Sequence, residues 1–145
     1  MKTTIAQAPR DLLSLLRVVE SAPDGDLDWA KHCTRQQAVI LRLLIPGGQV
    51  TDLVTLADTV GIPISLMDHI PVPGIAFPIK DGWHIHISES LTPTAQIRVA
   101  LHELKHVIDH PLRHKGEHRA AGFSAADYEY LADYFAACAL AEHEP

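Results

Sequence analysis

The five residues from His102 to His106 carry the strongest chemical signal in the chain, because they form the pattern His-Glu-x-x-His. On a helix, side chains four positions apart lie on one face, so His102 and His106 can bind the same metal ion. Glu103 lies next to that face, where its carboxylate can take a proton from a metal-bound water. Zinc suits this set, because it accepts imidazole nitrogen and carboxylate oxygen in a tetrahedral site. The alternative is a surface helix that carries two histidines by chance. The presence or absence of a third ligand distinguishes this alternative from a metal site.

Two carboxylates on a second predicted helix are candidates for that role. Ser124 is the expected N-cap of this helix, with Asp127 at the capping-box position, and the helix extends to about Cys138. If it packs against the motif helix, Glu129 can supply the third ligand. Asp133 can then accept the free ring N–H of a ligand histidine and fix its tautomer. The alternative is a solvated helix face, but apolar neighbours make poor surroundings for an unused charge at Asp133.

The composition limits the possible classes of protein. A chain of 145 residues with 47% apolar residues can form one domain with a hydrophobic core. The formal net charge of −6 argues against nucleic-acid binding by bulk electrostatics. Cys33 and Cys138 are not part of a Cys-x-x-Cys pair, which argues against a disulfide scaffold or a thiolate zinc site. Without a signal peptide or an apolar run of membrane length, we expect a soluble cytoplasmic protein.

Three helices are predicted before the strands, from Pro9 to about Ser21, from about Thr34 to Leu44, and from about Asp52 to Val60. Thr34 with Gln37 forms a capping-box pattern for the second. Thr51 and Gly61 suit the two ends of the third. The residues expected to be buried on or near the second helix are Trp29, Val39, Ile40, Leu43 and Leu44.

The stretch from Val54 to Ile62 resembles the first part of a helix-turn-helix, which raises the alternative of a DNA-binding winged helix. The charges disfavour it, because no lysine or arginine occurs between Arg42 and Lys80. A recognition element without cations cannot hold phosphates. We therefore expect no direct contact with nucleic acid.

A short strand is predicted at Ile62–Met67 and a hairpin at Gly74–Ser88, with its turn at Asp81-Gly82. Pro78 lacks a backbone donor, which places its strand at a sheet edge or at a bulge. The alternation in the second strand predicts that Trp83, Ile85 and Ile87 face the helices and that His84 and His86 are solvated rather than metal ligands.

The motif helix is expected to begin at Thr92-Pro93, as N-cap and first residue, and to end near His110, because Pro111 follows. Residues 111–123 are polar and are expected to form a surface loop that could carry substrate contacts. His110, just before this loop, and His114 and His118 within it are possible ligands or acid–base groups.

The two halves together, His-Glu-x-x-His and then Glu-x-x-x-Asp, form the gluzincin pattern and are similar to thermolysin. The metzincin pattern needs a histidine six residues after His106, where Leu112 stands. More narrowly, Arg98-x-x-x-His102-Glu103-Leu104-x-His106 and Glu129-x-x-Ala132-Asp133-x-Phe135-Ala136 resemble the ImmA/IrrE family of zinc metallopeptidases. The segment from Val50 to Ile62 resembles the helix that precedes the motif in that family, and the likeness covers about Gln36 to Leu140.

The resemblance implies an α+β fold, a single zincin-like metallopeptidase domain with helices around a small three-stranded antiparallel sheet. It implies zinc (Zn2+) as cofactor, His102, His106 and Glu129 as ligands, and Glu103 as catalytic base. It further implies a protein substrate, a helix-turn-helix repressor of a phage, mobile element or stress locus. A non-cleaving antirepressor or toxin-like binding protein on the same fold is the alternative. The candidates for an oxyanion donor or a substrate contact are His110, His114, Tyr128 and Tyr130.

One position departs from the family. Lys105 stands where the family usually has glycine, and we expect so bulky a cation to require an open face, since a packed face would distort the site. For the domain organisation we expect an N-terminal helix and turn at 1–33 and the metallopeptidase domain at 34–145, in one compact unit.

Overall fold

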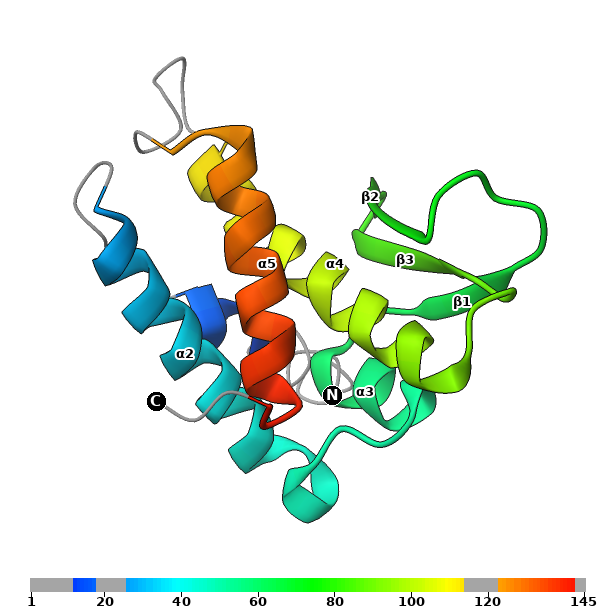
Figure 1. Cartoon of the computed structure of the whole chain (residues 1–145). Coiled ribbons are helices and arrows are strands. Elements are labelled where there is room, and N and C mark those ends of the chain that lie inside the picture. Colours follow the sequence, from blue (N-terminus) through cyan, green and yellow to red (C-terminus); the bar gives the residue numbers. More distant parts are fainter. Residues whose placement is uncertain (1–11, 18–25, 114–122, 143–145) are drawn as a thin grey trace.

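A computed structural model describes residues 12–17, 26–113 and 123–142. Its elements are a helical segment at 12–17, α2 (Leu27–Leu44), a 3-10 turn (Pro46–Gly48), α3 (Leu53–Val60), β1 (Ile64–Met67), β2 (Gly74–Ile79), β3 (Gly82–Ser88), α4 (Pro93–Arg113) and α5 (Ala125–Ala139). This confirms the α+β class. Helix α4 lies between the sheet on one side and α5 on the other, and α2 packs against α5 (Figure 1).

The sheet has three strands in the order β1-β3-β2, but it is mixed, so the expectation of an all-antiparallel sheet is wrong. Strands β2 and β3 form the predicted antiparallel hairpin, whereas β1 runs parallel to β3. The reason is that β3, after two chain reversals, enters between β1 and β2. Strand β2 is consequently an edge strand, as Pro78 predicts.

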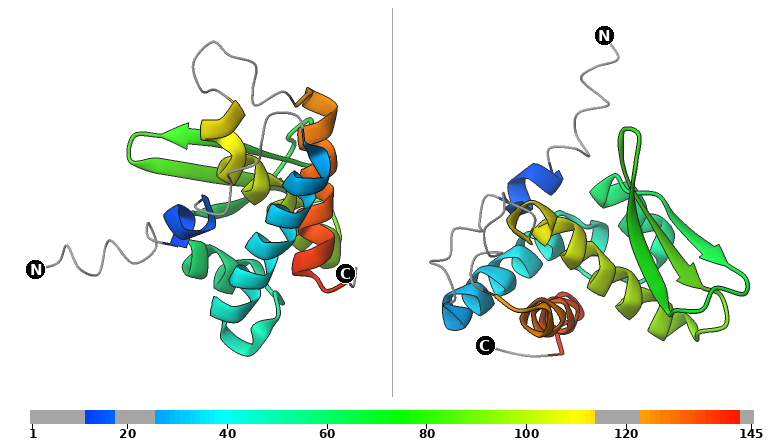
Figure 2. Two further views of the ribbon diagram at one scale, coloured as in Figure 1. Left: turned by 90° about the vertical axis from the view of Figure 1, so that its left-hand side faces the viewer. Right: turned by 90° about the horizontal axis from the view of Figure 1, so that it is seen from above.

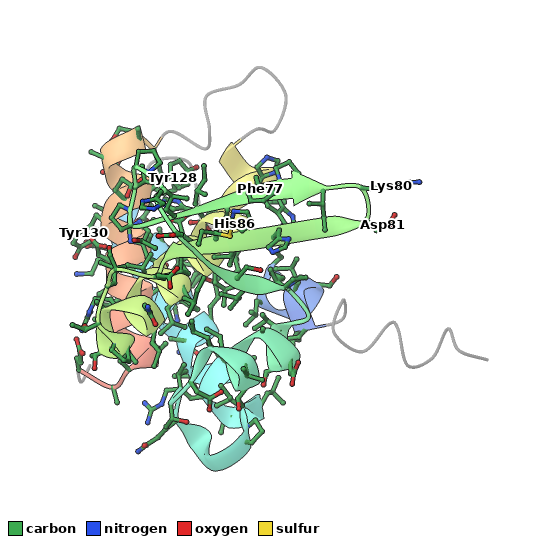
Figure 3. All side chains as sticks on the ribbon, turned by 90° about the vertical axis from the view of Figure 1, so that its right-hand side faces the viewer. Phe77, Lys80, Asp81, His86, Tyr128 and Tyr130 are labelled. Carbon is green, nitrogen blue, oxygen red and sulfur yellow. The ribbon has the colours of Figure 1, made fainter. Side chains whose placement is uncertain are left out.

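The hairpin turn also differs from the prediction. Ile79 pairs with Gly82, so the two loop residues are Lys80 and Asp81, seen at the hairpin tip in Figure 3. The close approach of β2 to α4 accounts for this register. The register places Gly74 opposite Ile87 and against α4, where a Cβ added to Gly74 would lie 2.5 Å from Val99 Cγ1. Ile85 and Ile87 face the core as predicted and are fully buried.

Helix α2 begins seven residues before the predicted start and therefore crosses the boundary expected between residues 33 and 34. Its N-cap is Asp26, whose carboxylate accepts a hydrogen bond of 3.0 Å from the Trp29 N–H. Thr34 lies inside the helix, and its hydroxyl donates to the Ala30 carbonyl at 2.8 Å. The capping-box prediction at Thr34 is wrong because a better cap lies upstream.

The buried face of α2 is likewise not the predicted one. Helix α5 packs against a face of α2 that carries small and polar side chains. The polar side chain of Gln37 can be buried on this face because it is hydrogen-bonded in the interior. The residues buried there are Ala30, Cys33, Thr34, Gln37, Ala38 and Leu41, whereas Trp29, Val39, Leu43 and Leu44 are exposed.

Helices α3 and α5 have well-defined caps. The N-cap of α3 is Asp52, which accepts from the Thr55 N–H at 2.7 Å, rather than the predicted Thr51. Gly61 ends α3 in the left-handed conformation, as predicted. In α5, both hydrogen bonds of the predicted capping box are present.

Helix α4 continues through Pro111 to Arg113 instead of ending before the proline. A proline cannot donate to the carbonyl four residues earlier, here that of Val107. Arg17 fills this gap, because its Nη2 donates to the Val107 carbonyl at 2.7 Å and its Nε donates to the Ile108 carbonyl at 3.3 Å. The segment 12–17 thus stabilises the end of α4. Figure 2 shows this segment beside that end of the helix.

Within the described ranges, no helix is both long enough and apolar enough to span a membrane.

Candidate metal centre

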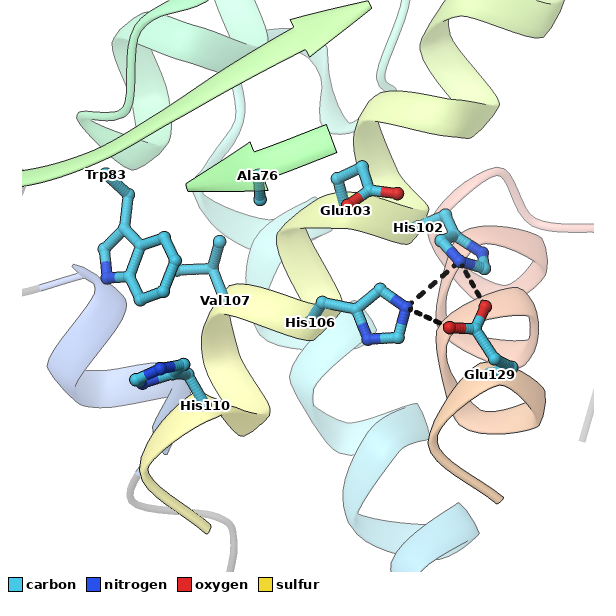
Figure 4. Close-up of a pocket in the computed structure, with 8 residues that line it drawn as sticks. All are labelled: Ala76, Trp83, His102, Glu103, His106, Val107, His110 and Glu129. Atoms are coloured by element: carbon cyan, nitrogen blue, oxygen red, sulfur yellow. Dashed lines mark hydrogen bonds and ion pairs between the residues drawn. The ribbon is translucent and has the colours of Figure 1, made fainter. Parts of the chain in front are cut away.

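Helices α4 and α5 bring three possible metal ligands together. His102 and His106 project from adjacent turns of α4, and Glu129 projects from the facing side of α5 (Figure 4). One ligand atom from each lies within 4.8 Å of the others. Glu129 approaches His102 Nε2 at 3.0 Å and His106 Nε2 at 3.1 Å, and the two ring nitrogens are 3.2 Å apart.

These separations fit a zinc ion. A tetrahedral site with metal–nitrogen bonds of about 2.0–2.1 Å holds its ligand atoms roughly 3.3 Å apart. The contact between His102 and Asp133 suits the same ion. Asp133 lies 2.7 Å from His102 Nδ1 and can accept a hydrogen bond from Nδ1–H, which in a neutral ring leaves the Nε2 lone pair for a metal. Two imidazole nitrogens and a carboxylate together form a donor set that suits a divalent metal.

Asp133 has the geometry predicted for it, although one reason given for the prediction is wrong. Its side chain is 76% exposed and does not lie among the apolar residues that neighbour it in sequence. Those residues face the opposite side of α5, where Leu131 and Phe135 are buried. The hydrogen bond to His102, rather than burial, accounts for this carboxylate.

Glu103 lies next to the three ligand atoms but is not one of them. Burial raises the pKa of its carboxyl above the usual range, His102 opposes this shift, and Glu129 adds to it. A hydrogen bond from the Ala76 backbone of β2 also favours the charged form. The sheet edge therefore positions Glu103 beside the three candidate metal ligands.

Two cavities adjoin the cluster, and His102, Glu103 and Glu129 line both. The first has a volume of about 290 Å³ and extends along α4 toward its C-terminal end. The second, of about 390 Å³, extends toward the N-terminal end. The first is further lined by Ala76, Trp83, His106, Val107 and His110, and the second by Val72, Pro73, Gly74, Arg98, Val99 and Asp133.

The predicted donor candidates are not all placed at these cavities. His110 lines the first, with its ring 4.8 Å from that of Trp83. Tyr128 is buried in a separate cluster against Phe123. Tyr130 follows Glu129 by one residue, a rotation of about 100°, and lies beside Lys31 of α2. Neither tyrosine lines either of these two cavities.

His114 and His118 lie outside the described residues. Sequence reasoning missed three other residues of the first cavity, namely Ala76, Trp83 and Val107. The alternation of the hairpin contained a signal for two of them, because Ala76 and Trp83 belong to its inward-facing set.

Lys105 lies on a packed face, contrary to the expectation of an open one. It is 2% exposed, and its Nζ donates to Asp109 at 2.7 Å and to Gln37 at 2.8 Å. Gln37 in turn donates to the Leu16 carbonyl at 3.1 Å. The cation is thus satisfied inside the core, and the ligand atoms of His102 and His106 still converge.

Comparison with known proteins identifies the family. Residues 57–144 match the family model described as Peptidase_M78, IrrE N-terminal-like domain. The chain belongs to this family. The match starts later than the sequence resemblance suggested, but it contains both helices of the metal cluster and the whole sheet. No curated protein and no solved structure matches the chain. Membership in Peptidase_M78 supports a hydrolase of the peptidase type and, with the three-residue cluster, a metal-dependent one.

Proposed function

We propose that the protein is a zinc-dependent endopeptidase that cleaves one intracellular protein. The observation that carries this proposal is the convergence of His102, His106 and Glu129 beside a carboxylate, Glu103, that is not itself one of the converging ligands. A purely structural zinc site is closed by four protein ligands, whereas a catalytic site has three. The cavities on both sides of the cluster give a peptide access to it.

The roles of the residues follow from their positions. His102, His106 and Glu129 would hold zinc, which when bound activates a water and polarises the scissile carbonyl. Glu103 would accept the proton of the attacking water and return it to the leaving amine. Asp133 would keep His102 in the tautomer that binds metal, and His110 is the remaining described candidate for the oxyanion donor.

We propose a helix-turn-helix repressor of a phage, mobile element or stress locus as the substrate. This rests on the family resemblance, and the useful test is co-incubation with the protein encoded beside this one. An antirepressor that binds without cleaving is the alternative. The presence of Glu103 at the cluster favours cleavage, because a binding protein does not need a base.

The metal site can be tested directly by elemental analysis. Purified protein should hold about one zinc per chain, and His102→Ala/His106→Ala should lose most of it. His84→Ala/His86→Ala is the matched control, since it removes two histidines from the opposite face of the sheet and should leave the zinc content unchanged. Full zinc content in the first variant would refute the site.

A further inference from the structure

We infer that the outer surface along α2 and α5 binds an acidic segment of a protein partner. We call this surface the α2/α5 patch, and its residues are Trp29, Lys31, His32 and Arg35 of α2 with Tyr130 and Tyr134 of α5. The binding itself does not require the metal cluster. That the partner is the substrate rests on the proposed peptidase function.

Side-chain contacts across the two helices join these residues into one surface. The Lys31 ammonium lies over both tyrosine rings, 5.6 Å from the centre of Tyr130 and 5.2 Å from that of Tyr134. The two rings are nearly parallel, and their centres are 6.3 Å apart. Arg35 Nη1 lies 3.4 Å from the Tyr134 hydroxyl. Two cationic groups are thus held over the same pair of rings.

These two cations have no acidic partner. Among the described residues, no carboxylate forms an ion pair with Lys31 or Arg35, although the chain has a net charge of −6. A hydrogen bond with Tyr130 and, more weakly, the charge of Asp28 raise the pKa of the Lys31 ammonium, so Lys31 is charged at neutral pH. Arg35 contacts only a phenol hydroxyl and an imidazole nitrogen, each at 3.4 Å. Its guanidinium can therefore donate two hydrogen bonds to a carboxylate of a partner.

The aromatic residues suit a protein partner. Trp29 is 40% exposed, with its ring 5.1 Å from that of His32, and Tyr130 is 42% exposed. Tryptophan, tyrosine and arginine are the residue types that contribute most to binding at protein interfaces. Nucleic acid also stacks on aromatic rings, but it needs a longer row of cations and would meet the carboxylates of Glu129 and Asp133 on α5. The patch therefore favours a short acidic protein segment.

The α2/α5 patch lies next to the candidate metal centre. Tyr130 follows Glu129 by one residue, and Tyr134 follows Asp133 in the same way, so each tyrosine is rotated by about 100° from a carboxylate at the cluster. Figure 3 shows Tyr130 on the outer side of α5. Because a helix is about 10 Å across, a protein bound at the cluster needs to cross only α5 to reach the patch. A substrate protein can thus contact both surfaces at once.

Trp29 provides a probe that lies within the patch. The chain has only two tryptophans, so a Trp83→Phe/Glu103→Gln protein with added zinc retains Trp29 alone and prevents turnover. The ligands are the acidic peptide Ac-Glu-Glu-Leu-Glu-Glu-NH2, its uncharged counterpart Ac-Gln-Gln-Leu-Gln-Gln-NH2 and a short oligothymidylate. At low salt, we expect the acidic peptide to change the fluorescence of Trp29 and to bind at least about fivefold more tightly than the glutamine peptide. High salt should remove most of this difference.

Substitution of the cations tests the assignment. Lys31→Gln and Arg35→Gln should each reduce the difference between the two peptides by about twofold or more, and together they should abolish it. Lys80→Gln is the matched control, because it removes the same charge from the tip of the hairpin. Figure 3 shows Lys80 and Tyr130 on opposite sides of the molecule, so Lys80→Gln should preserve the difference.

Three results would each overturn the inference: equal affinity for the two peptides, a difference that survives Lys31→Gln/Arg35→Gln, or no response of Trp29 to the acidic peptide. Tighter binding of the oligothymidylate would also overturn it and would assign the patch to nucleic acid. Failure of the proposed function gives a different result. In that case the acidic peptide would bind as expected, but the parent protein would not cleave the protein encoded beside it.

Discussion

Replacing Lys105 by methionine should severely destabilise the protein, because it removes the charge that balances Asp109 in the interior. Both side chains are nearly fully buried, at 3% and 2% exposure, and their ion pair of 2.7 Å joins successive turns of α4. Removing one partner of a buried pair leaves an uncompensated charge, which typically costs about 3–5 kcal/mol. Gln37 also loses its donor, so Lys105→Met should lie toward the upper end of that range.

The compensating change should reverse most of that loss. Asp109 Oδ2 is buried without a hydrogen-bond partner in the described part of the chain, so the pair is incompletely satisfied. Replacing both members with apolar residues of similar size is then expected to be close to neutral. Lys105→Met/Asp109→Leu should therefore lie within about 2 kcal/mol of the parent in unfolding free energy, the remainder reflecting Gln37.

Urea denaturation followed by circular dichroism, with zinc removed by a chelator, measures these free energies. Arg98→Met is the matched control, because it removes a cation from an exposed ion pair on the same helix. Exposed pairs contribute less than about 1 kcal/mol. If Lys105→Met destabilises no more than Arg98→Met, or if the double variant is as unstable as Lys105→Met, the reasoning about the buried pair is wrong.

Three further predictions concern the ligands, the end of α4 and the base. Asp133→Asn should weaken zinc affinity by about 10- to 100-fold, and Glu129→Ala should weaken it more. A competition titration measures both affinities, and the reverse order would contradict the assignment of Glu129 as a ligand and Asp133 as the partner of His102. Arg17→Met should lower the unfolding free energy by about 1–3 kcal/mol, because the Val107 carbonyl loses its donor. In a Pro111→Ala background the loss should be smaller, since the N–H of the alanine replaces the arginine donor. Equal losses in both backgrounds would refute this explanation. In metal-free protein, Glu103→Gln should be more stable than the parent at neutral pH. The pKa of the Glu103 carboxyl is higher in the folded protein than in the unfolded one. The stability that this group contributes is therefore present below its unfolded pKa and is lost as the pH rises through its folded pKa. The difference should therefore vanish in acid, and a constant difference across pH would contradict the cause given for the shift.

The convergence of His102, His106 and Glu129 could be predicted from the sequence because local rules determine it. Four-residue spacing sets the common face of His102 and His106, and a capping box fixes the start of the helix that carries Glu129. Once these two helices pack together, few other arrangements of the three side chains are possible. The role of Asp133 follows from its position one turn later.

The features that were predicted wrongly depend on partners distant in the sequence. Pro111 fails to end α4 because Arg17, more than ninety residues away, supplies a donor at that position. Lys105 is buried because Gln37 and Asp109 bind its ammonium group. The turn at Lys80-Asp81 follows from the close approach of β2 to α4, which the local turn preference does not include. Contacts of this kind cannot be found by examining one segment at a time.

The most direct test of the central claim compares the parent protein with Glu103→Gln on the protein encoded beside it. Glutamine preserves the size of the side chain but cannot accept the proton, so zinc content and partner binding should stay at the parent level. Cleavage, followed by mass spectrometry of the fragments, should fall by about 100-fold or more, the contribution typical of a general base. If Glu103→Gln instead inactivates the partner at full strength, the protein acts by binding, and the peptidase account is contradicted.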